Sequence, residues 1–148
     1  MSEFSHVDEE GGVRMVDVGG KPQSRRRAVA RARLTMAAET ASRLRSLPKG
    51  DALTTAQVAG VMAAKRTSDL IPLCHPLPLT SIDVAVAVDG TGAEVTATVE
   101  TTAQTGVEME ALVAASVAAL TLYDMAKAVD DSMSVSEVVL VEKTKEPA

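Results

Sequence analysis

The order of apolar and polar residues along the chain predicts alternating strands and helices joined by short turns. From position 25 to 36 arginine alternates with alanine and leucine, a period of two that is typical of a strand with one arginine-rich face. Because alanine and arginine also favour helices, a helix stays an alternative there. Residues 82–88 and 94–100 alternate on either side of a DGTG turn, which predicts an antiparallel hairpin. Residues 14–18 and 135–141 predict two shorter strands.

Three segments have the composition of helices, at 37–47, 54–66 and 105–129. The second begins with a capping box at Thr54, and the third begins with another at Thr105. Several strands, one hairpin and three helices predict an α+β fold in which the helices pack on one face of an antiparallel sheet.

Length and composition predict one domain. Of 148 residues 46% are hydrophobic, enough for a core, although the chain has one Phe, one Tyr and no Trp. We expect a flexible N-terminal segment at 1–12, a single domain at 13–143 and a C-terminal tail at 144–148. Small side chains must fill the core, which favours close backbone contacts and leaves surface for another subunit to cover.

Charge and cysteine content narrow the function classes. A net charge of −5 argues against a general nucleic-acid binder. No apolar run reaches the roughly 18 residues of a membrane span, and we expect no signal peptide. The single cysteine allows no intrachain disulfide, which fits a reducing cytoplasm.

Positive charge is clustered within this acidic chain. The cluster comprises Arg25, Arg26, Arg27, Arg31 and Arg33. Such a patch suits a small phosphorylated ligand, although a solvated face is the commoner explanation. Lys65 and Arg66 end a predicted helix, where they suit the helix dipole as well as they suit a phosphate.

The stretch LCHPLPL holds Cys74 beside His75. A zinc site needs three or four ligands, and the other histidine lies in the expected flexible segment. A Cys–His nucleophile is also disfavoured, because neighbouring side chains of an extended chain point to opposite faces. A buried cysteine and a structural histidine would be the ordinary explanation. The prolines at 72, 76 and 78 instead favour a rigid segment that presents His75 to a ligand.

The long helix carries charges among apolar residues. Asp124 and Lys127 share a face, either as a surface ion pair or as an acid/base element. Glu108 fits the capping box, whereas Glu110 has no such role. Glu110 and Asp124 are separated by about 21 Å in an unbroken helix, so a site that uses both would need two chains.

Two long motifs resemble the cyclic pyranopterin monophosphate synthase family, the molybdenum cofactor biosynthesis protein C family. They are AAKRTSDLIPLCHPL at 63–77 and TGVEMEAL at 105–112, the second continuing through 114–129. Residues 15–18 and 49–51 also match in order, so the resemblance covers nearly the whole chain. The tail after the last predicted strand departs from the family pattern, and Lys143 has only a loose counterpart.

This resemblance implies a ferredoxin-like α+β fold and a lyase that turns a 3′,8-cyclised dihydro-GTP into cyclic pyranopterin monophosphate and diphosphate. It implies a cytoplasmic homo-oligomer, a hexamer built as a trimer of dimers, with active sites at the dimer interface. No redox cofactor is required, and Mg²⁺ assistance stays open. No nucleic acid and no membrane are expected as partners.

The resemblance also assigns site residues. The catalytic positions are Asp124, Lys49, Lys127 and His75. The substrate-binding positions are Leu73, Cys74, His75, Met109, Glu110, Lys65 and Arg26. Two rival interpretations remain: a non-catalytic nucleotide-binding protein that keeps the pocket, and a structural oligomer subunit whose charged positions are interface ion pairs.

Overall fold

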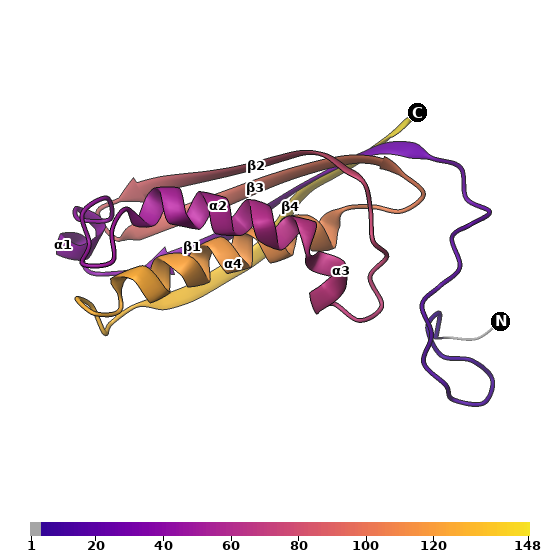
Figure 1. Ribbon diagram of the computed structural model, residues 1–148, viewed down its shortest axis with the longest axis horizontal. Coiled ribbons are helices and arrows are strands. Elements are labelled where there is room, and N and C mark those ends of the chain that lie inside the picture. Colours follow the sequence, from indigo (N-terminus) through magenta and orange to yellow (C-terminus); the bar gives the residue numbers. More distant parts are fainter. Residues whose placement is uncertain (1–3) are drawn as a thin grey trace.

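The computed structural model describes residues 4–148, and its frame is one antiparallel sheet with helices on one face (Figure 1). The strands are β1 Ser24–Thr35, β2 Leu79–Asp89, β3 Gly92–Ala103 and β4 Ser134–Pro147, in the spatial order β2-β3-β1-β4. The helices are α1 Ala38–Ala41, α2 Ala52–Lys65, α3 Thr67–Leu70 and α4 Glu108–Ala126. This chain order and sheet order are those of a ferredoxin-like fold, so the predicted fold class is confirmed.

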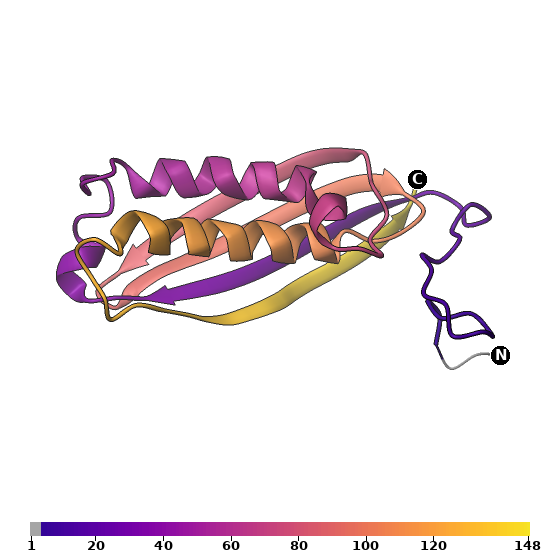
Figure 2. The ribbon, with the colours of Figure 1, turned by 60° about the horizontal axis from the view of Figure 1, so that its bottom comes forward.

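The core forms where α2 and α4 lie side by side across the sheet (Figure 2). Even-numbered residues of β1 face the helices, and Ala28, Ala30 and Ala32 are fully buried there. Gly60 of α2 lies so close to Val84 of the sheet that a Cβ would meet its side chain at 3.0 Å. Small residues therefore let helices and sheet approach closely enough to form a core almost without aromatic rings.

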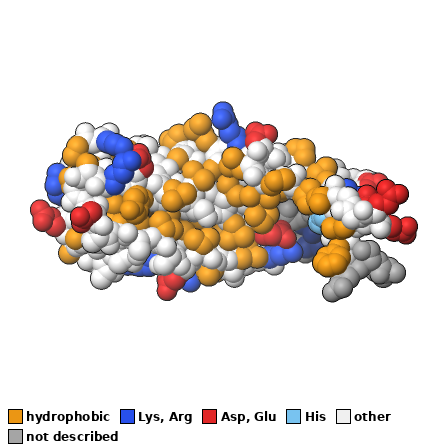
Figure 3. Space-filling model, turned by 90° about the horizontal axis from the view of Figure 1, so that it is seen from below, with side chains coloured by type: hydrophobic (Ala, Val, Ile, Leu, Met, Phe, Trp, Pro, Cys, Tyr) orange, Lys and Arg blue, Asp and Glu red, His pale blue; other side chains and the backbone are white. Residues whose placement is uncertain are grey.

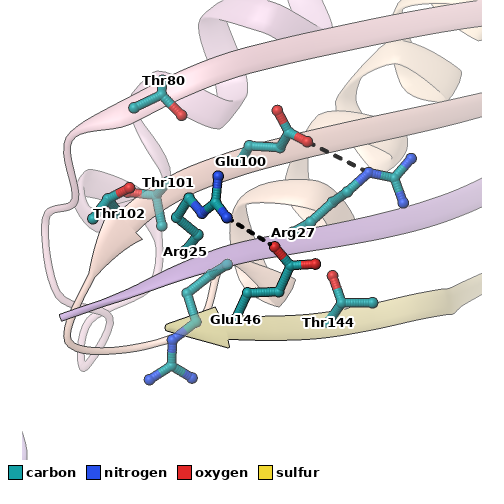
Figure 4. A pocket seen from close by; sticks show the side chains of 9 residues that line it. Arg25, Arg27, Thr80, Glu100, Thr101, Thr102, Thr144 and Glu146 are labelled. Carbon is teal, nitrogen blue, oxygen red and sulfur yellow. Dashed lines mark hydrogen bonds and ion pairs between the residues drawn. The ribbon is translucent and has the colours of Figure 1, made fainter. Parts of the chain in front are cut away.

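Odd-numbered residues of β1 form the opposite face of the sheet, and most of its arginines are neutralised there. Arg25 pairs with Glu146 at 3.2 Å, and Arg27 lies 3.6 Å from Glu100 (Figure 4). Arg33 is bonded to an aspartate at the hairpin turn. The pairs of Arg25 and Arg27 join adjacent strands, so these side chains stabilise the sheet through cross-strand contacts.

The helix boundaries differ from the prediction. The helix expected at 37–47 is only α1, followed by turns. The second helix begins at Ala52 and not at Thr54, because the Asp51 carboxylate accepts hydrogen bonds from the amides of Leu53 and Thr54 and caps it. The fourth begins at Glu108 without a side-chain cap and ends at Ala126, so the capping box predicted at Thr105 was wrong.

The chain ends also differ from the prediction. Residues 14–18 are not part of the sheet, and the nearest pairing is an isolated bridge between Val7 and Val13. The last strand continues to Pro147, so 144–147, expected as a tail, pair with β1. The flexible segment expected at 1–12 lies partly outside the described residues.

Within the part of the chain that the structure describes, α4 is the one helix long and apolar enough to cross a membrane. Half of its 18-residue window is buried inside the fold. This burial is that of a core helix, since α4 packs against β1 and β3.

Candidate active site

Two groups of candidate site residues lie at opposite ends of α4. At its C-terminal end, the Asp124 carboxylate accepts a hydrogen bond from Lys49 Nζ at 3.0 Å. Lys127 Nζ lies 2.9 Å from the other oxygen of Asp124. The fold thus assembles three of the four predicted catalytic residues into one cluster, which we call the Lys–Asp–Lys cluster.

The Lys–Asp–Lys cluster is open to solvent and holds its carboxylate ionised. About half of each side chain is exposed, 44% for Lys49, 55% for Asp124 and 56% for Lys127. Hydrogen bonds from Lys127 and then Lys49 lower the pKa of Asp124. With two ammonium groups around one carboxylate, the cluster can bind an anionic ligand and relay protons between ligand atoms.

The second group surrounds a pocket of about 540 Å³ at the N-terminal end of α4. Its wall includes Leu73, Cys74, His75 and Met109, four of the predicted site residues. The wall is completed by Ser5, His6, Val16, Val18, Lys21, Ile71, Leu77, Thr105, Gly106 and Glu108. A mostly apolar cavity with a few polar groups is the usual form of a small-molecule site.

Glu110 lies behind Cys74 rather than on the wall itself. The Cys74 thiol donates to Glu110 Oε2 at 3.6 Å, and Glu110 is only 3% exposed. Its other oxygen, Oε1, has no hydrogen-bond partner among residues 4–148. Burial raises the pKa of Glu110, and it raises that of Cys74 to about 11. Cys74 is therefore a neutral thiol and not a nucleophile.

His75 is fixed by the N-terminal segment. Its Nε2 lies 2.6 Å from the carbonyl oxygen of Val16. Because a carbonyl oxygen only accepts, Nε2 carries a proton, and in the neutral form of the ring Nδ1 is the acceptor. The thiol of Cys74 contacts Glu110 and the His75 backbone oxygen, which agrees with the argument against a Cys–His couple.

Glu108 is a pocket residue that the sequence did not reveal. Its Oε1 lies 2.9 Å from Lys143 Nζ of β4. Burial is the largest single influence and opposes its ionisation, but the hydrogen bond from Lys143, a backbone hydrogen bond and the charges of Lys143 and Arg26 together lower the pKa of Glu108. A Cβ at Gly106 would lie 2.2 Å from Glu108 Oε2, so a larger residue there would displace this carboxylate from its present position. Lys143 lies 35 residues further along the chain, and no local pattern links it to Glu108.

Lys65 and Arg26 lie outside the pocket. Lys65 borders a separate hollow on α2 together with Val58 and Met62. Arg26 borders a hollow of about 230 Å³ at the end of the sheet, and its guanidinium donates to the Gln104 carbonyl oxygen at 3.5 Å. Its Nε is buried and has no partner within the described part of the chain.

Glu110 and Asp124 remain far apart in the folded chain. The helix α4 runs unbroken between them, so the 14 residues correspond to about 21 Å. One chain therefore carries two half-sites, the pocket and the Lys–Asp–Lys cluster. In residues 4–148 no three His, Cys, Asp or Glu side chains are grouped to hold a metal ion.

Known proteins resemble the chain over nearly its whole length. The cyclic pyranopterin monophosphate synthase of Heliobacterium modesticaldum is 56% identical over 148 residues, covering 97% of this chain and 93% of that protein. The synthase of Thermomicrobium roseum is 54% identical, covering 97% and 89%. A molybdenum cofactor biosynthesis bifunctional protein of Chlorobaculum tepidum is 54% identical over 96% of this chain and 46% of its own length. The MoaC family model matches residues 15–146, and the chain belongs to this family.

Proposed function

We propose that the chain is a cyclic pyranopterin monophosphate synthase of molybdenum cofactor biosynthesis. It would convert (8S)-3′,8-cyclo-7,8-dihydroguanosine 5′-triphosphate into cyclic pyranopterin monophosphate and diphosphate, as a phosphorus–oxygen lyase in the cytoplasm. The names of the relatives support this proposal. The observation that carries it is the Lys–Asp–Lys cluster, formed from segments 75 residues apart.

The reaction requires proton transfers and the departure of a charged group. A substrate hydroxyl attacks the α-phosphorus and loses its proton, while the bond to the β-phosphate oxygen breaks and diphosphate leaves. Asp124, ionised between two lysines, suits the role of proton acceptor. Lys49 and Lys127 would donate protons and stabilise the charge of the leaving diphosphate.

The pocket suits the ring system of the substrate. Leu73 and Met109 give it apolar walls, and His75 Nδ1 offers an acceptor for a ring N–H or hydroxyl group. Behind them the buried Glu110 and the Cys74 thiol set the shape of the pocket. We assign substrate binding to these residues, and we keep Lys65 and Arg26 as contacts to the triphosphate from outside this pocket.

A complete site would then require two chains, the pocket of one and the Lys–Asp–Lys cluster of another. We propose a dimer with shared sites, assembled into a hexamer as a trimer of dimers. Apolar side chains gather on the helix-covered face (Figure 3), including the exposed Val58, Met62, Leu70 and Leu120. An apolar surface of this kind is typical of a subunit contact.

The proposed reaction needs no redox cofactor, because the ring rearrangement and the loss of diphosphate involve no net oxidation or reduction. Mg²⁺, whose preferred ligands are oxygens, would enter with the triphosphate rather than on a cluster of protein carboxylates. The described residues place only one carboxylate in the Lys–Asp–Lys cluster. The two alternative functions are a nucleotide-binding protein without catalysis and a structural subunit of an oligomer.

The test is product formation by purified protein from the cyclised dihydro-GTP, measured as diphosphate and pterin. His75→Gln and Asp124→Asn chains should each be inactive, and a dimer of one of each should keep one intact site. Mixed after dissociation, they should recover about a quarter of the activity if chains pair at random. Substrate binding without product would favour the non-catalytic protein, and disassembly of Asp124→Asn would favour the structural subunit.

A further inference from the structure

The N-terminal segment forms one side of the pocket, although the sequence predicts a flexible segment at 1–12 and a short strand at 14–18. Ser5, His6, Val16, Val18 and Lys21 all belong to the wall. In Figure 1 this segment passes the end of the sheet beyond α3 and continues toward the N-terminus. The pocket therefore combines residues that precede β1 with residues of the segment before β2 and of the start of α4.

Several bonds hold this segment in place. Val16 accepts the hydrogen bond from His75 at 2.6 Å. The amide of Arg14 donates to the His6 carbonyl oxygen at 2.7 Å, and this closes a loop. A turn follows in which the amide of Lys21 donates to the carbonyl oxygen of Val18 at 3.0 Å. These backbone bonds place Lys21 at the pocket wall.

The charges of the wall leave Lys21 without a counter-charge. Glu108 is the one carboxylate among the lining residues, and Lys143 already neutralises it at 2.9 Å. Lys21 Nζ makes no ion pair with any residue from 4 to 148. Lys21 is exposed at the rim of this mostly apolar cavity, and an unpaired ammonium group there can attract an anion that enters the pocket.

A nucleotide in this pocket also needs a cation from this part of the fold. Arg26 and Lys65, the triphosphate contacts proposed above, border other hollows, and Arg25 and Arg27 are paired with carboxylates. Within one chain the Lys–Asp–Lys cluster lies about 21 Å away along α4, so in the proposed dimer it would reach this pocket only from the other chain. Lys21 is the only lysine or arginine among the lining residues, and it makes no ion pair with the described residues.

We infer that Lys21 is a further substrate-binding residue, which holds the polyphosphate of a nucleotide whose base occupies the pocket. This inference rests on the proposed function for the identity of the nucleotide. The hydrogen bond from His75 to Val16 then has a second role, because it fixes the segment that carries Lys21. The segment before β1 becomes part of the active site.

Binding of GTP and of guanosine to the full-length oligomer tests this inference by calorimetry. Lys21→Met should raise the Kd for GTP roughly tenfold, the usual effect of losing one charge-assisted contact, and leave that for guanosine unchanged. Lys21→Arg should restore GTP binding. Arg14→Met is the matched control, because Arg14 lies in the same segment but borders a different hollow; its Kd should stay within about twofold of wild type.

The inference is overturned if Lys21→Met and Arg14→Met bind GTP with equal affinity while both oligomers are intact by size and circular dichroism. The inference is also overturned if Lys21→Met loses guanosine binding as much as it loses GTP binding, because this would mean a general disturbance of the pocket. Turnover separates the two proposals. If Lys21→Met forms product with an unchanged KM, the proposed role of Lys21 is wrong and the proposed synthase activity stands. Lys21-dependent GTP binding without any product removes the synthase and leaves Lys21 as an anion-binding residue.

Discussion

Lys49 and Asp124 are 75 residues apart in the chain, yet Lys49 Nζ donates to Asp124 Oδ2 across 3.0 Å. Lys49 lies in the turn before α2, and Asp124 lies in the last turn of α4. The antiparallel packing of these helices brings the two positions together. Lys127, from the end of the same helix, completes the cluster at 2.9 Å.

Asp124→Asn should abolish most activity while leaving the fold intact. The amide keeps the shape of the side chain but cannot accept a proton, so kcat should fall roughly 100-fold or more. Stability should change little, because the pair is solvent-exposed and such pairs contribute little to folding. Steady-state turnover and thermal melting measure both effects.

The matched control for Asp124→Asn is Glu146→Gln, which breaks the exposed pair with Arg25 on the opposite face of the sheet. Its turnover should equal that of wild type. A large drop in melting temperature for Asp124→Asn, without a change in kcat per folded chain, would contradict the catalytic role.

Glu110→Gln should stabilise the protein at high pH. Burial raises the folded-state pKa of Glu110 above its ordinary 4.5, so the folded state binds the proton more tightly. The stabilisation by this group is full below 4.5 and is lost as pH rises through the folded value. At pH 8 glutamine avoids the cost of ionising a buried group, and the free energy of unfolding should rise by about 1 kcal/mol.

Urea denaturation at pH 5 and pH 8, at one protein concentration, measures this difference. The gain from Glu110→Gln should shrink at pH 5, where more of the wild-type carboxyl keeps its proton. An equal loss of stability at both pH values would show that the carboxyl is needed for packing and not for its proton.

Cys74 should react slowly with alkylating reagents. Desolvation is the main cause that raises its pKa to about 11, and the charge of Glu110 adds to it. At pH 8 only about one thiol in a thousand is then ionised, so alkylation by iodoacetamide should be roughly 100-fold slower than for a free cysteine. Mass spectrometry follows the modification over time.

The same cysteine in the urea-unfolded chain is the control, and it should react at the rate of a free thiol. Cys74→Ala should keep turnover within a few-fold of wild type, since the thiol supplies shape rather than a nucleophile. Rapid alkylation of the folded protein, together with an inactive Cys74→Ala, would restore the nucleophile hypothesis.

Gly92→Ala should weaken the fold. Gly92 begins β3 at φ +152°, and a Cβ there would lie 2.0 Å from the carbonyl oxygen of Leu34 in β1. The backbone must move, which should cost about 2 kcal/mol or more in the free energy of unfolding. Gly90→Ala, in the same turn, has no atom within 4 Å of the new Cβ and should cost far less. Similar losses for both variants would locate the effect in the turn itself.

The periodic elements could be predicted from sequence because their patterns are local. Alternation in 25–36 and around the DGTG turn gave three strands of the sheet, since burial on one face repeats every second residue. The start of α2 was misplaced, because Thr54 offers a capping box while Asp51, three residues earlier, makes the bonds. Two plausible caps in one turn are decided by geometry that the sequence does not contain.

The candidate site likewise contains some residues that the sequence predicted and some contacts that it could not predict. Asp124 and Lys127 share a helix face by spacing alone, the prolines pointed to the LCHPLPL segment, and motif resemblance added Lys49. The bond from His75 to Val16, the pairing of Glu108 with Lys143 and the position of Lys21 on the pocket wall could not be predicted. Each joins segments that are distant in sequence and carry no shared pattern.

The sequence by itself determined the strands, the long helix and the residue types available for chemistry, because backbone periodicity and side-chain chemistry are local properties. Only the tertiary structure decided which of those residues meet. Sheet register places Lys143 beside Glu108, and helix packing places Lys49 beside Asp124. The length of α4 separates Glu110 from Asp124. Such contacts depend on how the elements pack against one another, and the local sequence pattern around each residue does not specify this packing.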